Sequence, residues 1–254
     1  MLRLFRRDKP SGTIAQDSLD VAHEGAVYRV SLKRVTGARR YTLRVRNATR
    51  DVVITMPKRG SLEAARDFAQ RHAAWIAARL HRLPAAVPFM HAAKIPLRGV
   101  DHEIVHVNEL RGRIEISTSQ DSVRRLVVFC SEEHLPRRIH DYLKREAKKE
   151  LESAVRRHTT SLGFAARRVT VRDTTSRWGS CSASGSLNFS WRLIMAPDFV
   201  LDYLAAHEVA HLVHMNHSEE FWALTHRLAP QTDRAEAWLH AHGASLHRYG
   251  VEQT

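Results

Sequence analysis

The chain has 254 residues, of which 43% are apolar and 26% are charged, so it can bury a core and is not a disordered chain. The formal net charge of +13 favours attraction of anions, but a solvated basic surface explains it as well as a nucleic-acid partner does. The two cysteines form no Cys-x-x-Cys pair, which argues against a disulfide framework and a thiolate metal site.

The N-terminus is basic and no apolar segment follows it, so we expect a flexible arm over residues 1–20 and no secretory signal. No apolar run approaches the ~18 residues that cross a bilayer. We therefore expect a cytoplasmic protein with no membrane partner, while the sequence gives no indication of its oligomeric state.

Residues 21–135 are predicted to form a strand-rich part with one helix. Apolar and polar residues alternate over 41–45, and further strands are indicated at 26–33, 52–54, 103–107, 113–117 and 125–129. A helical stripe that includes Leu62 and Trp75 predicts one helix over 61–83, with Ser61 as N-cap and Pro84 after its end.

Residues 136–254 are predicted to be mainly helical. A helix begins at Pro136 and ends near Gly163, and two strands at 168–172 and 186–191 are joined by a Ser- and Gly-rich segment. Helices follow from Pro197 through His211, at 218–228 and at 233–246. The pattern predicts an α+β fold in which 21–135 and 136–254 are separate parts or together form one compact domain.

The chemistry is concentrated in His207-Glu208-Val209-Ala210-His211, an HExxH motif on a predicted helix. Residues four apart share a helix face, so both imidazoles can reach one metal ion while Glu208 holds a water bound to it. Seventeen histidines make a chance match less rare, but the apolar surroundings of the motif argue against unpartnered His and Glu side chains.

A third ligand is expected beyond the motif. His214 lies seven residues after His207, about 10 Å further along the helix axis, which is too far for one ion, so it is interpreted as a helix-end residue. His217 follows a segment that can turn back and is the preferred ligand, with Glu219, Glu220 and Glu236 as alternatives. Three imidazoles with an open position fit catalytic zinc best, although Co, Ni or Mn would also fit.

The stretch from Ser176 to Pro230 resembles the YgjP-like metal-dependent hydrolases, relatives of the SprT-like and minigluzincin metallopeptidases. The matching pieces are RWGSC at 177–181, Asn188, WRL at 191–193, Pro197, DY at 202–203, the HExxH, NHS at 216–218 and FW at 221–222. The resemblance implies His217 as third ligand, Glu208 as base and a zincin-like C-terminal part. It also implies an antiparallel sheet on the HExxH helix, in which the strand at 186–191 borders the cleft and pairs with an extended peptide.

Within the matching pieces, Arg177 and Asn188 are candidates for substrate binding. Arg177 can hold an oxyanion, a carboxylate or a phosphate, or it can simply stabilise a turn. Trp178 is interpreted as packing, Gly179 as a position that needs a bulge or a positive φ, and Cys181 as a small buried side chain.

The leading functional prediction is a zinc-dependent metallopeptidase that acts on peptides or unfolded protein. A metal-dependent nucleoside triphosphate hydrolase is an alternative, although the sequence has no P-loop. A DNA-associated SprT-like protease is another, but a zinc finger or helix-turn-helix pattern is absent from the sequence, so nucleic acid is not favoured as a partner.

Overall fold

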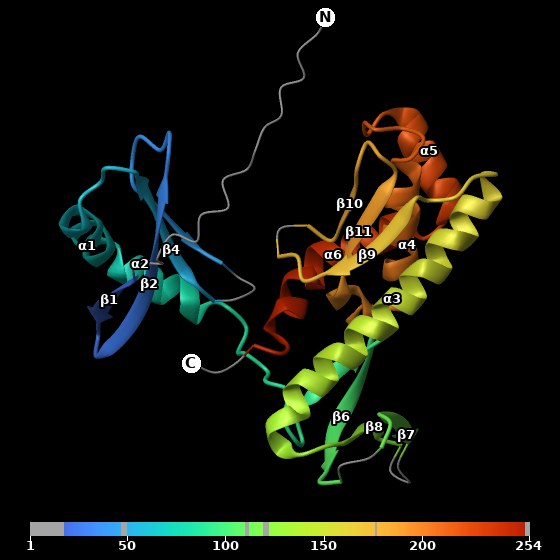
Figure 1. The fold of residues 1–254 in the computed structure, drawn as a ribbon, viewed down its shortest axis with the longest axis horizontal. Coiled ribbons are helices and arrows are strands. Elements are labelled where there is room, and N and C mark those ends of the chain that lie inside the picture. Colours follow the sequence, from blue (N-terminus) through green and yellow to red (C-terminus); the bar gives the residue numbers. More distant parts are fainter. Residues whose placement is uncertain (1–17, 47–49, 110–111, 119–121, 176, 252–254) are drawn as a thin grey trace, which may run out of the picture. The chain divides into compact units, whose positions relative to one another are not determined.

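The computed structural model describes residues 18–46, 50–109, 112–118, 122–175 and 177–251, drawn in colour in Figure 1. The chain divides into two compact units, Met1–Leu83 and Pro84–Thr254. Both combine strands and helices, which confirms the predicted α+β class. The division of the sequence at residue 135 stays a prediction, because compactness does not test which part folds by itself.

The first unit is a four-stranded sheet with two helices. Its strands lie in the order β1-β2-β4-β3, with bounds β1 Ser18–His23, β2 Ala26–Val35, β3 Thr42–Val45 and β4 Val52–Pro57. Residues 1–17 of the predicted arm and residues 47–49, between the strands predicted at 41–45 and 52–54, lie outside the described residues, while residues 18–20 belong to β1. The expected alternation holds in β3, where Val45 is buried and Arg44 is exposed.

The single helix predicted over 61–83 is wrong. The segment forms two helices, α1 (Leu62–Arg71) and α2 (Ala73–His81), which are separated at His72. The His72 N–H donates to the Ala69 carbonyl, and its Nδ1 lies 2.8 Å from the Phe68 carbonyl. Ser61 does cap α1, accepting a hydrogen bond from Ala64 N. Leu62 and Trp75, predicted to lie on the buried face, are 50% and 47% exposed.

The second unit begins with a sheet of the same topology as the first. Its order is β5-β6-β8-β7, with bounds β5 Lys94–Leu97, β6 Val100–Val107, β7 Glu115–Thr118 and β8 Arg124–Phe129. In both sheets the two inner strands are parallel and each outer strand is antiparallel to its neighbour. The strand expected at 113–117 corresponds to β7, which begins two residues later. The sequence pattern did not predict β5.

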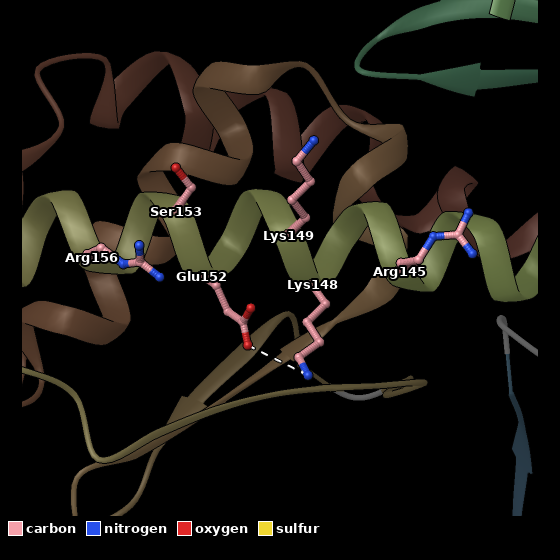
Figure 2. Close-up of a pocket in the computed structure, with 6 residues that line it drawn as sticks. All are labelled: Arg145, Lys148, Lys149, Glu152, Ser153 and Arg156. Carbon is pink, nitrogen blue, oxygen red and sulfur yellow. Dashed lines mark ion pairs between the residues drawn. The ribbon is translucent and has the colours of Figure 1, made fainter. Parts of the chain in front are cut away.

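The long helix α3 (Leu135–Ser161) joins this sheet to the rest of the second unit (Figure 1). It contacts β8, β9 (Arg168–Arg172) and α4 (Asp198–Ala210). Pro136 lies in its first turn and Gly163 follows its end with φ +75°, as predicted. Figure 2 shows its exposed basic face, where Lys148 and Glu152 form an ion pair of 3.7 Å one turn apart. Such pairs are typical of a solvated helix surface.

The site lies in the remaining elements. They are β9 (Arg168–Arg172), β10 (Gly179–Cys181), β11 (Ser186–Ser190), the 3₁₀ helix η2 (Trp191–Met195), α4 (Asp198–Ala210), α5 (Glu219–Leu228), α6 (Thr232–His242) and the 3₁₀ helix η3 (Gly243–Arg248). No helix in the described ranges has the length and apolar character needed to cross a membrane.

The strand expected to pair with a peptide is in the middle of its sheet. The order is β10-β11-β9, with β11 antiparallel to β10 and parallel to β9, so the sheet is mixed. The prediction that the strand at 186–191 pairs with an extended peptide is therefore wrong, because both edges of β11 are already paired within the sheet. β10, inside the segment predicted as a connector, is the edge strand beside it.

Candidate metal centre

Three imidazoles converge where α4 ends. His207 lies in the last turn of α4, His211 is its C-cap residue, and His217 lies in the turn before α5. One nitrogen from each ring lies within 4.8 Å of the others, and the Nε2 atoms of His207 and His217 are 3.3 Å apart. Two imidazole nitrogens this close need a proton or a cation between their lone pairs.

His214 lies between His211 and His217 in the sequence but does not belong to the cluster. Its backbone carbonyl instead lies 3.1 Å from Nδ1 of His211. Since a carbonyl only accepts, His211 donates from Nδ1 and keeps the lone pair of Nε2 free. The predicted alternatives Glu219, Glu220 and Glu236 are likewise outside the cluster found among the described residues.

Phe221 forms the support on which the three rings rest. It is fully buried in the first turn of α5, and its ring centroid lies 4.9, 4.5 and 4.7 Å from those of His207, His211 and His217. Trp222 adds a contact of 5.9 Å with His207 and with His217. Phe221 and Trp222 therefore fix the orientation of two histidines, His207 and His217, that lie ten residues apart in the chain.

A hydrogen-bonded chain fixes the ring of His207. The Tyr203 hydroxyl donates to Glu236 Oε1 at 2.8 Å, and its oxygen lies 3.3 Å from Nδ1 of His207. Because the hydroxyl has one hydrogen, His207 donates from Nδ1 and its Nε2 keeps the lone pair that faces His217. Burial, helped by the two neighbouring histidines, lowers the pKa of His207 to about 4, which favours the neutral ring.

Glu208 is buried beside the cluster. It is 4% exposed, and its Oε2 makes no hydrogen bond within the described part of the chain. Burial raises the pKa of this carboxyl to about 7, while the nearby charge of Arg177 acts in the opposite direction. An unpartnered buried carboxylate oxygen is costly, and it is ready to accept a proton from a bound molecule.

Gly179 explains how the Glu208 carboxyl fits. A Cβ atom on Gly179 would clash with Oε1 and lie 2.8 Å from both Cγ and Cδ of Glu208. Neither predicted reason for the glycine, a bulge or a positive φ, applies: Gly179 pairs with Phe189 in the regular register of β10 and is absent from the described glycines with positive φ. The glycine is required because the carboxyl occupies the space of a side chain.

The two predicted substrate-binding residues, Arg177 and Asn188, differ in their relation to Glu208. Arg177 is exposed, two residues before β10, and its charge acts to lower the pKa of Glu208. Asn188 is paired with Ser180, so alternation directs its side chain to the opposite face from Gly179 and Phe189. Cys181 is a part-buried free thiol whose pKa is raised by burial and by Glu208, in line with a packing role.

Three imidazoles with open nitrogens and an adjacent buried carboxylate are the donor set of a hydrolytic metal site. The model of the YgjP-like family, described as a metallopeptidase domain, matches residues 39–242. The chain therefore belongs to this family and is a metal-dependent peptidase, which confirms the resemblance seen in the sequence.

Similarity to individual proteins is more limited. The crystal structure of the metallopeptidase zymogen of Pyrococcus abyssi abylysin aligns with 22% sequence identity and a TM-score of 0.34. That alignment covers 40% of this chain and 99% of the abylysin chain. A comparison with curated proteins found no match.

Proposed function

We propose that the protein is a zinc-dependent peptidase in which His207, His211 and His217 hold the metal and Glu208 is the general base. The proposal is carried by one observation: three imidazole nitrogens converge within 4.8 Å, beside a buried carboxyl.

The donor set fits zinc. The hydrogen bonds of His207 and His211 occupy their Nδ1 atoms, so the Nε2 atoms of both rings are left as ligands, and His217 presents its own Nε2 to His207. Neutral imidazoles without a thiolate or carboxylate are typical of catalytic zinc. When bound, zinc would act as a Lewis acid that lowers the pKa of a water molecule to about 7 and polarises a carbonyl.

Glu208 then performs the proton transfers. Its free Oε2 accepts a proton from the attacking water, and the same carboxyl delivers that proton to the amine that leaves. The carboxyl cannot turn further toward β10, because Gly179 lies against it, and this contact restricts its orientation before substrate arrives. Arg177 is suited to hold an oxyanion or a substrate carboxylate beside this base.

The substrate we propose is an extended peptide along β10. In the antiparallel register with β11, Ser190 N donates to the Trp178 carbonyl and Ser182 N donates to the Ser186 carbonyl. The N–H and C=O groups of Gly179 and Cys181 therefore point away from β11, toward the free edge. A peptide that pairs with them lies beside Glu208, which supports peptide bonds as the target.

Metal analysis of the purified protein tests the ligand set. We expect about one zinc per chain, lost in His207→Ala, His211→Ala and His217→Ala. His214→Ala is the matched control, because this residue lies in the same segment but outside the cluster, and it should keep the zinc. Full zinc in the His217 variant, or loss in the His214 variant, would contradict the proposed ligands.

Activity is tested in parallel on an unfolded protein, on peptides and on nucleoside triphosphates. Nucleotides are included because an arginine beside the base can also hold a phosphate. We expect hydrolysis of peptide bonds that a chelator abolishes and added zinc restores. Metal-dependent turnover of nucleotides alone would replace the peptidase proposal with phosphoanhydride hydrolysis.

A further inference from the structure

A buried arginine fastens the C-terminal segment η3 to the sheet. Arg192, 6% exposed, donates from Nη1 to the carbonyls of Leu246 at 3.0 Å and Tyr249 at 2.8 Å. Its Nε donates to Asp173 Oδ1 at 3.2 Å. Detaching η3 would leave the buried Arg192 guanidinium without these carbonyl acceptors, which is costly. The segment η3 is therefore held next to the end of β11.

Trp178 lies on this segment. Its ring is stacked on His247, with centroids 5.1 Å apart and an interplanar angle of 26°. Gly243 lets the indole approach the backbone of η3, since a Cβ there would lie 3.2 Å from Cζ2 of Trp178. The Trp178 carbonyl also accepts a hydrogen bond of 2.8 Å from Ser190 N. Side chain and backbone of Trp178 are therefore both held.

The next residue is Gly179, whose Cα lies against the Glu208 carboxyl. The position of this backbone atom depends on Trp178, because Gly179 has no side chain of its own to anchor it. A shift of β10 toward α4 would press on the carboxyl, and a shift away would leave it free to change rotamer.

We propose that Trp178, Gly243 and His247 are positioning residues that hold Glu208 through Gly179. The inference rests on the proposed function, in which Glu208 is the base. It makes η3 part of the catalytic apparatus, although η3 follows the residues 39–242 that the family model matches. His247 acts here through its ring face, because its Nδ1 is buried without a hydrogen-bond partner among the described residues.

The inference predicts a graded series of variants. Gly179→Ala should lower kcat about 100-fold, because sub-ångström to ångström displacement of a catalytic group is costly. Trp178→Ala and His247→Ala should lower kcat about tenfold, with KM changed less and zinc retained. Trp178→Phe and His247→Phe keep a ring in the stack and should restore kcat to within about threefold of the wild type.

The matched control is Ser180→Ala, on the same strand but with its side chain on the face opposite to Gly179. It should leave kcat within about twofold. Thermal denaturation of every variant identifies any that fail to fold, and the Phe variants carry the test if an Ala variant does fail.

Crystal structures of the variants give a readout that does not need activity. We expect the Glu208 carboxyl to be displaced in Gly179→Ala and Trp178→Ala, and unmoved in Ser180→Ala and Trp178→Phe. An unmoved carboxyl in the first two, or wild-type kcat in folded, zinc-loaded protein, overturns the inference. An inactive wild type with a displaced carboxyl in these variants would refute the proposed function and still support the positioning.

Discussion

Tyr203→Phe is the substitution that best separates metal affinity from folding. Phenylalanine fills the same space in a residue that is 4% exposed, so the core stays packed. What is removed is the oxygen that accepts from His207 Nδ1 and the hydrogen that binds Glu236. The ring of His207 then loses the partner that fixes its orientation and tautomer.

The size of the effect follows from this geometry. Loss of a hydrogen-bond partner of a metal-binding histidine costs about 10–100-fold in metal affinity, or about 1.4–2.7 kcal/mol. Folding of the metal-free protein should lose about 1–3 kcal/mol, the net value of the two hydrogen bonds that are removed. The zinc dissociation constant, measured by competition with a chelator, should rise at least tenfold, and the metal-free unfolding midpoint, measured separately, gives the share of the change that comes from folding.

Two further variants sharpen the test. Tyr142→Phe makes the same chemical change in a buried tyrosine of α3, outside the histidine cluster, and should leave zinc affinity unchanged. Glu236→Ala frees the Tyr203 hydrogen to turn toward His207 and should weaken zinc in the same direction as Tyr203→Phe. A zinc dissociation constant in Tyr203→Phe equal to that of the wild type would refute the reasoning.

Three other predictions follow from the site and the surface. Glu208→Gln should keep its zinc and lose about 10²–10⁴ in kcat, since the amide cannot accept a proton; near-wild-type turnover at matched zinc would place the base elsewhere. Burial, together with the charge of Arg192, lowers the pKa of His247 to about 4 from 6.5, so the unfolded chain binds an extra proton between these values. Stability therefore falls as pH drops through this range, by about 3 kcal/mol, and His247→Phe should remove that part of the slope in denaturant unfolding; identical slopes would contradict it. Arg40, Arg44 and Arg46, all exposed on or beside β3, should bind DNA weakly and lose it by ~0.15 M salt in filter binding. Tight binding at about 0.2 M salt that is lost in the triple variant would instead support a DNA-linked role.

The sequence predicted the parts of the site that depend on local geometry. The spacing of His207 and His211 on one helix turn, and the turn that returns His217, are properties of a short segment, and the structure brings these three residues together. The rejection of His214 rested on the rise per residue of a helix, and it lies outside the cluster. The N-cap Ser61 and the first-turn proline Pro136 could also be predicted, because their effects act within a few residues.

What the sequence could not give depends on contacts between distant segments. The helix break at His72 and the parallel pairing of β9 with β11 leave no mark on hydrophobic periodicity. The three-residue strand β10 is too short for an alternation signal, so the strand at 186–191, and not β10, was predicted to pair with a peptide. Gly179 was noticed, but only the fold shows that a carboxyl from α4 lies against it.

The histidine cluster and the Glu208 carboxyl therefore depend on different parts of the chain. The proposed ligands and the aromatic rings that contact them come from α4, α5 and the turn between them, so the metal should survive changes in β10 or η3. The proposed base, Glu208, lies on α4, but its carboxyl is confined by β10, and the residue before β10, Trp178, stacks on His247 of η3. Variants of the ligand group should lose zinc and activity together, whereas variants of the β10–η3 group should lose activity and keep zinc. A protein that loses zinc on His247→Ala would show that the two groups are coupled through the core, and the separation argued from these contacts would not hold.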